Sequence, residues 1–121
     1  MKIEDVTEIN LYKRDVKSIE DVNYHYLKID GDKVEIDNAN SIIKLAKINS
    51  LLNKLLDLTE AYLDSEYRCQ LYEYNKDDLM LKFFLVIKFK NKTYLAIKGN
   101  RPFNQPNYKE ILDILTKLFN L

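Results

Sequence analysis

The stretch Leu79–Lys90, LMLKFFLVIKFK, decides how this chain folds. Its length, its β-branched and aromatic residues and the turn-forming residues around it predict one long β-strand. Successive side chains of a strand point to opposite faces, so the odd positions form one large apolar row that must face a hydrophobic core. The even positions are apolar in the middle and basic toward the ends: Met80, Lys82, Phe84, Val86, Lys88 and Lys90. This pattern predicts a second face that is half covered, by another segment of the chain or by another molecule.

The next stretch, Thr93–Gly99, predicts a strand that forms a hairpin with the first one. A three-residue loop, Lys90–Lys92, places Leu95 on the core face, whereas a two-residue loop would reverse every pairing and place Lys98 there. We therefore expect the three-residue loop, with its middle or last residue at positive φ.

A weaker strand is predicted upstream, over Tyr67–Tyr74, with Cys69 and Leu71 on the core face and a loop at about Tyr74–Asp78. Together the three strands form a meander, in which consecutive strands are antiparallel neighbours. Its face away from the core then carries a mixed aromatic and basic patch: Arg68, Tyr72, Met80, Lys82, Phe84, Val86, Lys88, Tyr94, Ala96 and Lys98. This patch is the first candidate for a working surface.

The first half of the chain predicts strands followed by a helix. Met1–Arg14 fits either a helical face or an alternating strand, and the alternation favours the strand. Val22–Asp37 predicts a β-hairpin around a central Asp-Gly-Asp turn. A long helix with a wide leucine-rich stripe is expected from Asn40 or Ser41 to about Asp64.

Both prolines of the chain lie in Gly99–Pro106, which predicts an irregular loop. Asn107, with Glu110 three residues later, fits a capping box that begins the last helix. The expected order is therefore β-β-β-α-β-β-β-α. Both helices are expected to cover the core face of one antiparallel sheet of about five to six strands, which makes an α+β fold of two layers.

From Ala39 onward the expected elements follow the order helix, three-stranded meander, proline-bearing loop, helix. This order resembles that of the RWD family of interaction domains, with the preceding hairpin as an addition. The resemblance is one of fold, and it implies a domain that works by interaction.

Length and composition bound the class of protein. With 121 residues, 46% of them hydrophobic, and only two glycines and two prolines, the chain is expected to form one ordered domain over residues 1–121. The formal net charge is +0, so no overall field attracts nucleic acid or a membrane surface, although lysines dominate from Lys76 to Lys98. A single cysteine allows no internal disulfide, and no apolar run approaches ~20 residues, so a soluble, cytoplasmic protein without a membrane span is expected.

Few residues of the chain suggest catalysis. His25 is the only histidine, and a catalytic role would need Cys69 or Asp37 within reach. A lone histidine in a strand is more often structural, and a core-facing cysteine is normally inert. One cysteine and one histidine provide no zinc site, and no glycine-rich phosphate loop occurs, so neither a metal nor a cofactor is expected.

The leading hypothesis is a non-catalytic protein-binding module of adaptor, inhibitor or immunity type, which binds a protein partner or a second copy of itself. Tyrosine is frequent, and tyrosine and arginine are enriched where proteins bind each other. The candidate contact residues belong to the meander's outer patch and to the proline-bearing loop: Tyr72, Lys82, Phe84, Lys88, Tyr94, Lys98, Arg101 and Phe103.

Two alternatives remain. Lysines interleaved with Tyr72, Phe84 and Tyr94 would suit a nucleic-acid-binding sheet, which uses phosphate contacts and base stacking. The last alternative is a small enzyme that uses His25 and nearby carboxylates.

Overall fold

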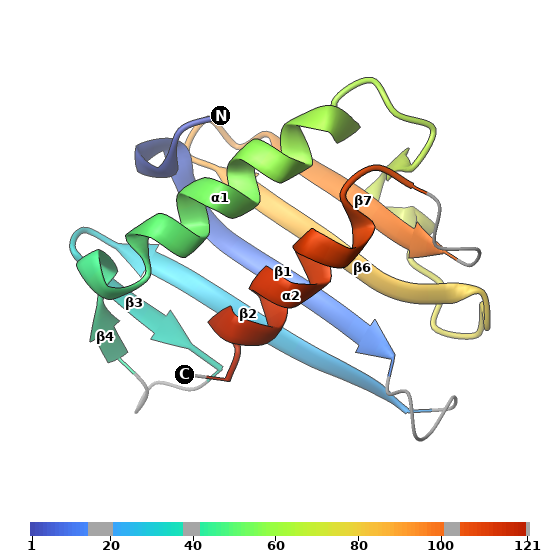
Figure 1. Cartoon of the computed structure of the whole chain (residues 1–121), viewed down its shortest axis with the longest axis horizontal. Helices are drawn as coiled ribbons and strands as arrows, with labels where there is room; N and C mark the ends of the chain where they lie inside the picture. Colours follow the sequence, from blue (N-terminus) through green and yellow to red (C-terminus); the bar gives the residue numbers. More distant parts are fainter. Residues whose placement is uncertain (15–20, 38–41, 101–104, 121) are drawn as a thin grey trace.

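A computed structural model describes residues 1–14, 21–37, 42–100 and 105–120 of the chain. In these ranges one antiparallel sheet of seven strands is covered on one face by two helices (Figure 1), which confirms the α+β class. The order across the sheet is β4-β3-β2-β1-β6-β7-β5. The strands are β1 (Val6–Arg14), β2 (Val22–Asp30), β3 (Lys33–Ile36), β4 (Ile42–Lys44), β5 (Arg68–Cys69), β6 (Leu81–Phe89) and β7 (Tyr94–Asn100), and the helices are α1 (Asn49–Thr59) and α2 (Tyr108–Leu118). Short 3-10 helices lie at Ile3–Asp5, Leu45–Lys47, Glu60–Tyr62 and Leu71–Glu73.

The first residues form a strand, β1, as their alternation indicated, and this strand is the central one of the sheet. It pairs with β2 on one side and with β6 on the other. Ile9 lies between Leu27 and Ile87, so three large apolar side chains stand in one row on the face that the helices cover. This strand therefore joins the two halves of the sheet.

Both predicted hairpins form with the expected register. In β2–β3 the turn contains Gly31 at φ +62°. In β6–β7, Leu95 lies opposite Ile87, and the Phe89 amide donates to the carbonyl oxygen of Thr93 at 2.9 Å. The last residue of the three-residue loop, Lys92, has φ +67°, as that loop requires.

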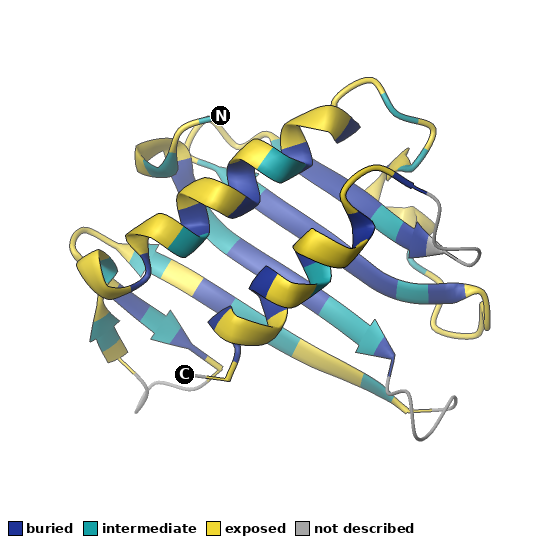
Figure 2. Cartoon of the chain, in the orientation of Figure 1, coloured by how far each residue is buried: buried dark blue, intermediate teal, exposed yellow. Residues whose placement is uncertain are grey.

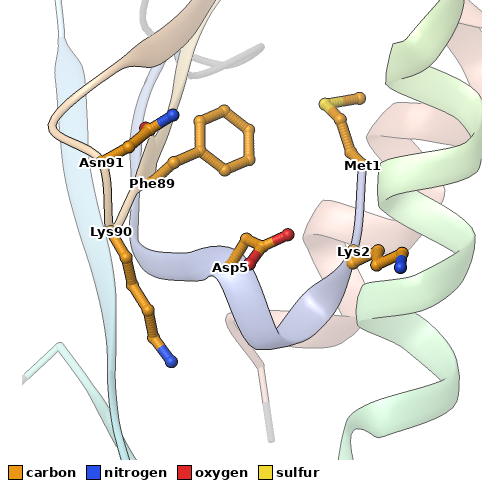
Figure 3. Close-up of a pocket in the computed structure, with 6 residues that line it drawn as sticks. All are labelled: Met1, Lys2, Asp5, Phe89, Lys90 and Asn91. Atoms are coloured by element: carbon orange, nitrogen blue, oxygen red, sulfur yellow. The ribbon is translucent and has the colours of Figure 1, made fainter.

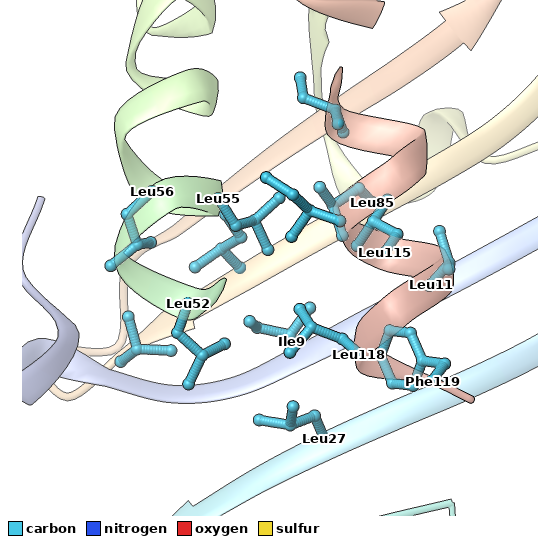
Figure 4. Close-up of a cluster of buried hydrophobic side chains, with 14 of the residues drawn as sticks. Ile9, Leu11, Leu27, Leu52, Leu55, Leu56, Leu85, Leu115, Leu118 and Phe119 are labelled. Atoms are coloured by element: carbon cyan, nitrogen blue, oxygen red, sulfur yellow. The ribbon is translucent and has the colours of Figure 1, made fainter. Parts of the chain in front are cut away.

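The main hydrophobic core lies between the sheet and the two helices (Figure 4). Leu52 and Leu55 of α1 and Leu115 and Leu118 of α2 are buried against it. Figure 2 shows the buried sides of both helices turned toward the sheet and their exposed sides turned to solvent. Phe83, Leu85 and Ile87 belong to this core, as predicted. Leu81 was expected to face it too, but it packs with Phe84 and Val86 in a second cluster, because the strand register shifts between Leu81 and Phe83.

The long helix predicted from residue 40 is wrong in its first half. Ile42–Lys44 is strand β4, which pairs with β3, and α1 begins only at Asn49. The expected caps Asn40 and Ser41 lie outside the described residues. Ile43 fits a helical stripe equally well, but pairing opposite Val34 adds a strand to the sheet. This additional strand explains why the expected count of five to six is too low.

The predicted meander does not form. Strand β5 has two residues and pairs with β7 at the sheet edge, while β1 takes the place beside β6. Because Cys69 lies opposite Ala96, it points away from the helices and not into the main core. The likeness in element order to RWD domains depended on this meander and on a helix starting near residue 40, and neither is present.

The last helix begins where it was predicted, but not with the predicted cap. Asn107 has φ +55°, and its side chain makes no capping hydrogen bond. Its Nδ2 donates instead to the carbonyl oxygen of Leu58, which links the start of α2 to the end of α1. The expected loop is shorter than Gly99–Pro106, because β7 continues to Asn100. Over the described ranges no helix has the length and apolar character needed to cross a membrane.

Candidate functional site

The outer face of the sheet, which the helices leave open, is partly covered by the chain itself. The connection between β5 and β6, here called the covering segment (Gln70–Met80), lies over it. Tyr74 stacks on Tyr12 of β1, with ring centroids 4.3 Å apart, and contacts the Phe84 ring edge-on at 5.3 Å. Phe84 is consequently only 2% exposed, as is Val86. The expectation that Phe84 is available to a partner or to a nucleic-acid base is therefore wrong.

A buried arginine fastens the covering segment to the sheet. Arg14, at the end of β1, is 4% exposed. Its Nε donates to the carbonyl oxygen of Leu81 at 3.0 Å, and its Nη2 donates to those of Lys76 and Asp78 at 2.6 and 3.1 Å. Such charge-assisted hydrogen bonds are stronger than neutral ones. Arg14 was not a predicted site residue, because nothing in its local sequence distinguishes it from an exposed strand end.

The start of the covering segment is also held in place. The Gln70 amide donates to Glu73 Oε2 at 2.5 Å, and the Gln70 side chain completes a capping box for the 3-10 helix Leu71–Glu73. The Tyr94 hydroxyl donates to Gln70 Oε1 at 2.6 Å. This predicted site residue thus lies half-buried beside the covering segment.

The covering segment buries Phe84 but exposes apolar side chains of its own. Four of its large apolar side chains are exposed: Leu71, Tyr72, Leu79 and Met80. Tyr72, a predicted site residue, is 85% exposed. Contiguous exposed apolar patches mark binding surfaces, whereas single exposed apolar side chains are common on protein surfaces.

The predicted lysines are spread over the outer face. Lys88 Nζ lies 3.1 Å from Glu8 Oε2 and is paired within the sheet. Lys82 and Lys98 are half-buried on β6 and β7. Arg101 and Phe103 lie outside the described residues. The predicted basic and aromatic patch is therefore broken up by Phe84 beneath the covering segment and by the ion pair of Lys88.

A groove opens at the edge of β7, where β5 ends. Its volume is about 320 Å³, and it is lined by side chains of β5, the covering segment and the β6–β7 loop: Arg68, Cys69, Gln70, Lys92, Thr93 and Tyr94. Burial, with Glu73 as a smaller cause, raises the pKa of the Cys69 thiol to about 11. The thiol is therefore overwhelmingly protonated at neutral pH and is a poor nucleophile.

A larger pocket, of about 420 Å³, lies near the start of the chain (Figure 3). Its walls come from the first five residues and from the β6–β7 turn: Met1, Lys2, Asp5, Phe89, Lys90 and Asn91. The Phe89 ring and the Met1 side chain point toward each other across it, and the Asp5 carboxylate lies below them in this view. The lining contains no histidine, cysteine or hydroxyl side chain.

His25 lies far from the groove, on the helix-covered face. Its Nδ1 is 3.0 Å from Asp37 Oδ2, and its ring stacks on Phe119 at 5.2 Å. Asp37 has φ +60° and accepts a hydrogen bond at Oδ1 from the Tyr26 amide. The sequence named Asp37 as a possible partner, and the structure brings the two together, but Cys69 lies on the opposite face of the sheet.

The described residues contain no group of histidine, cysteine and carboxylate side chains that could hold a metal ion. Comparisons of the chain with models of protein families, with curated proteins and with solved structures found no match.

Proposed function

We propose that this protein is a non-catalytic protein-binding module, of adaptor, inhibitor or immunity type. It binds its partner through a docking surface made of the 3-10 helix Leu71–Glu73 and the adjoining groove at the edge of β7. The observation that carries this proposal is Tyr72, which is 85% exposed on an element held by its own capping box.

The rigidity of this element favours binding. The capping box and the Tyr94–Gln70 hydrogen bond fix the backbone from which Leu71 and Tyr72 project. A side chain presented by a fixed backbone loses less entropy when it is buried by a partner. Tyrosine adds a large, stiff ring with a polar tip, the type of side chain that often dominates binding energy.

The placement of the reactive side chains supports a non-catalytic role. His25 and Cys69 lie on opposite faces of the sheet, so they cannot act as a base and nucleophile pair. The groove has an arginine and a lysine but no general base, since its cysteine is buried and protonated.

The proposal is tested by removing the Tyr72 ring. The protein is isolated with its bound partners from its own cells, as wild type, Tyr72→Ser and Ile42→Ser, and each complex is weighed by native mass spectrometry. Ile42 is also an exposed apolar residue but belongs to β4 at the opposite edge of the sheet, so its variant is a matched control. We expect one stoichiometric partner with wild type and Ile42→Ser and its loss with Tyr72→Ser, at unchanged melting temperature.

A homodimer that disappears only in Tyr72→Ser would make a second copy the partner. A partner retained by Tyr72→Ser, or a monomer in every sample, would overturn the proposed docking surface.

A further inference from the structure

On the free side of β7, the main-chain groups of Ala96 and Lys98 have hydrogen-bond partners. Strand β5 pairs with β7 at Arg68 opposite Ile97 and at Cys69 opposite Ala96. The Lys98 amide donates to the Tyr67 carbonyl oxygen at 3.0 Å, and the Lys98 carbonyl oxygen accepts from Gln105 Nε2 at 2.9 Å. Beyond Cys69 the chain leaves the sheet, because it turns into the 3-10 helix Leu71–Glu73.

Tyr94 lies beyond this pairing, at the start of β7. In an antiparallel pair, residues with both main-chain groups turned toward the neighbour alternate with residues whose groups turn away. The Phe89 amide donates to Thr93, so Thr93 and Leu95 face β6 and Tyr94 faces the sheet edge. Within the described part of the chain, no strand pairs with Tyr94 on that side. Its N–H and C=O therefore form an open template for another strand.

There is room for such a strand. The groove of about 320 Å³ lies at this position, in line with β5, and Tyr94 itself forms part of its wall. An extended segment placed there would continue the two-residue β5 along β7. Proteins recognise peptides in this way, with main-chain hydrogen bonds providing affinity and side-chain contacts providing selectivity.

The charges around the groove are basic. Arg68 and Lys92 line it, and the Arg68 Nη1 donates to the Leu63 carbonyl oxygen, which keeps the guanidinium near the edge. Glu73 of the covering segment is not among the lining residues and accepts a hydrogen bond from the Gln70 amide. Its charge reaches the Cys69 thiol, as does the opposite charge of Lys98. An acidic ligand would therefore meet two cations and no repelling carboxylate among the lining residues.

We propose that the edge of β7 binds an extended, acidic segment of a partner protein by strand addition, with its main chain paired to Tyr94 and its carboxylates facing Arg68 and Lys92. This inference rests on the proposed protein-binding function and specifies the partner's chemistry. A second copy of this chain does not fit, since two such edges would place cation against cation. A phosphate backbone does not fit either, because it has no peptide N–H to donate to the Tyr94 carbonyl.

The probe is a display library of random octapeptides, selected against wild type, Lys92→Glu and Lys90→Glu. Lys90 lies in the same β6–β7 loop but lines the other pocket, so Lys90→Glu changes the net charge equally and is the matched control. We expect wild type and Lys90→Glu to enrich acidic peptides without proline. Lys92→Glu should bind the same peptides about fivefold more weakly, which corresponds to one exposed ion pair exchanged for a repulsion.

Strand addition is then measured at Tyr94 directly. With a selected peptide at a hundred times its Kd, exchange of the Tyr94 amide with D₂O should slow by about 100-fold. Methylating the peptide nitrogens at every second residue should abolish binding for one set of positions and leave it intact for the other, because only one edge of the added strand pairs.

Selection of no peptide, enrichment of neutral or basic peptides, or unchanged exchange at Tyr94 would overturn strand addition. The proposed protein-binding function and the proposed strand addition can be overturned independently of each other. If Tyr72→Ser loses the cellular partner while wild type selects no acidic peptide, the docking surface stands and the acidic strand is excluded.

Discussion

At the scale of single residues, the fold lowers the reactivity of the Cys69 thiol. It lies 5% exposed at the edge of the groove, and burial raises its pKa from the ordinary value of 9.0 to about 11. The reactive thiolate is therefore about 100-fold scarcer than in the unfolded chain at any pH well below 9.

We predict that iodoacetamide at pH 8 alkylates native Cys69 at least about 100-fold more slowly than the urea-unfolded chain. The folded protein favours the neutral thiol, so this stabilisation is present below pH 9 and is lost as the pH rises toward 11. Between those values the unfolding free energy of wild type should fall more steeply than that of Cys69→Ala. Mass spectrometry and urea titrations check the two parts, and equal alkylation rates in the two states would contradict the prediction.

Whether the environment of a residue could be predicted depends on how close in sequence its spatial neighbours are. A positive φ at Asn91 or Lys92 was predictable, because a three-residue hairpin loop needs such a residue, and the structure places it at Lys92. The surroundings of Phe84 were not, because Tyr74 and Tyr12 reach it from a connection and from a strand far along the chain. The same alternation of side chains is compatible with a covered and with an open face.

At the scale of elements, the covering segment converts part of an open sheet face into a second small core. That core contains Cys69, Leu81, Phe84, Val86 and Ala96, with tyrosines packed against it. The segment contains only one turn of 3-10 helix, so its place depends on Tyr74 and on the three carbonyl oxygens that Arg14 binds. Arg14 is thus the main polar link between this segment and β1.

We predict that Arg14→Met lowers the unfolding free energy by about 2–4 kcal/mol, since it leaves carbonyl oxygens near the sheet without their donor. The loss should be local at first, with proteolysis within residues 75–80 becoming fast while the amides of β1 and β2 stay protected. Lys13→Met, which removes an equal charge from the neighbouring residue of β1, serves as the control. A cleavage rate equal to that of the control would show that Arg14 does not hold the segment.

The elements themselves were predictable where pairing is local. Both hairpins have tight turns and strands of adequate length, so sequence neighbours pair. Strand β4 was misread because Ile42, Ile43 and Leu45 fit a helical stripe as well as a strand. Pairing with β3, and the hydrogen bond from the Leu45 amide to the Asp32 carbonyl oxygen, decide for the strand.

At the scale of the whole molecule, β1 lies between two groups of strands, and among the described strands it alone pairs with both. On one side are β2, β3 and β4, and on the other β6, β7 and β5. Ile9 and Leu11 of β1 are fully buried beneath the helices, so this strand supplies core side chains as well as hydrogen bonds to both groups.

We predict that deletion of residues 1–14 leaves an unfolded chain, because it exposes the facing edges of β2 and β6 and removes the middle of the core. Deletion of residues 1–5 alone, which precede β1, should preserve the fold at reduced stability. Circular dichroism and amide exchange distinguish the two truncations. A cooperatively folded protein without β1 would show that each group of strands is stable by itself.

The sequence by itself determined the class of fold, both hairpins with their register, and the face of β6 that packs against the helices from Phe83 to Ile87. These features depend on side-chain alternation and short turns, which neighbouring residues encode. Only the tertiary structure decided that β1 lies between β2 and β6, that β5 pairs with β7, and that Gln70–Met80 covers Phe84. Such contacts join segments distant in the chain, and many strand orders satisfy the same alternation. The order that forms buries the apolar side chains of β1 and β6 and pairs both edges of β1.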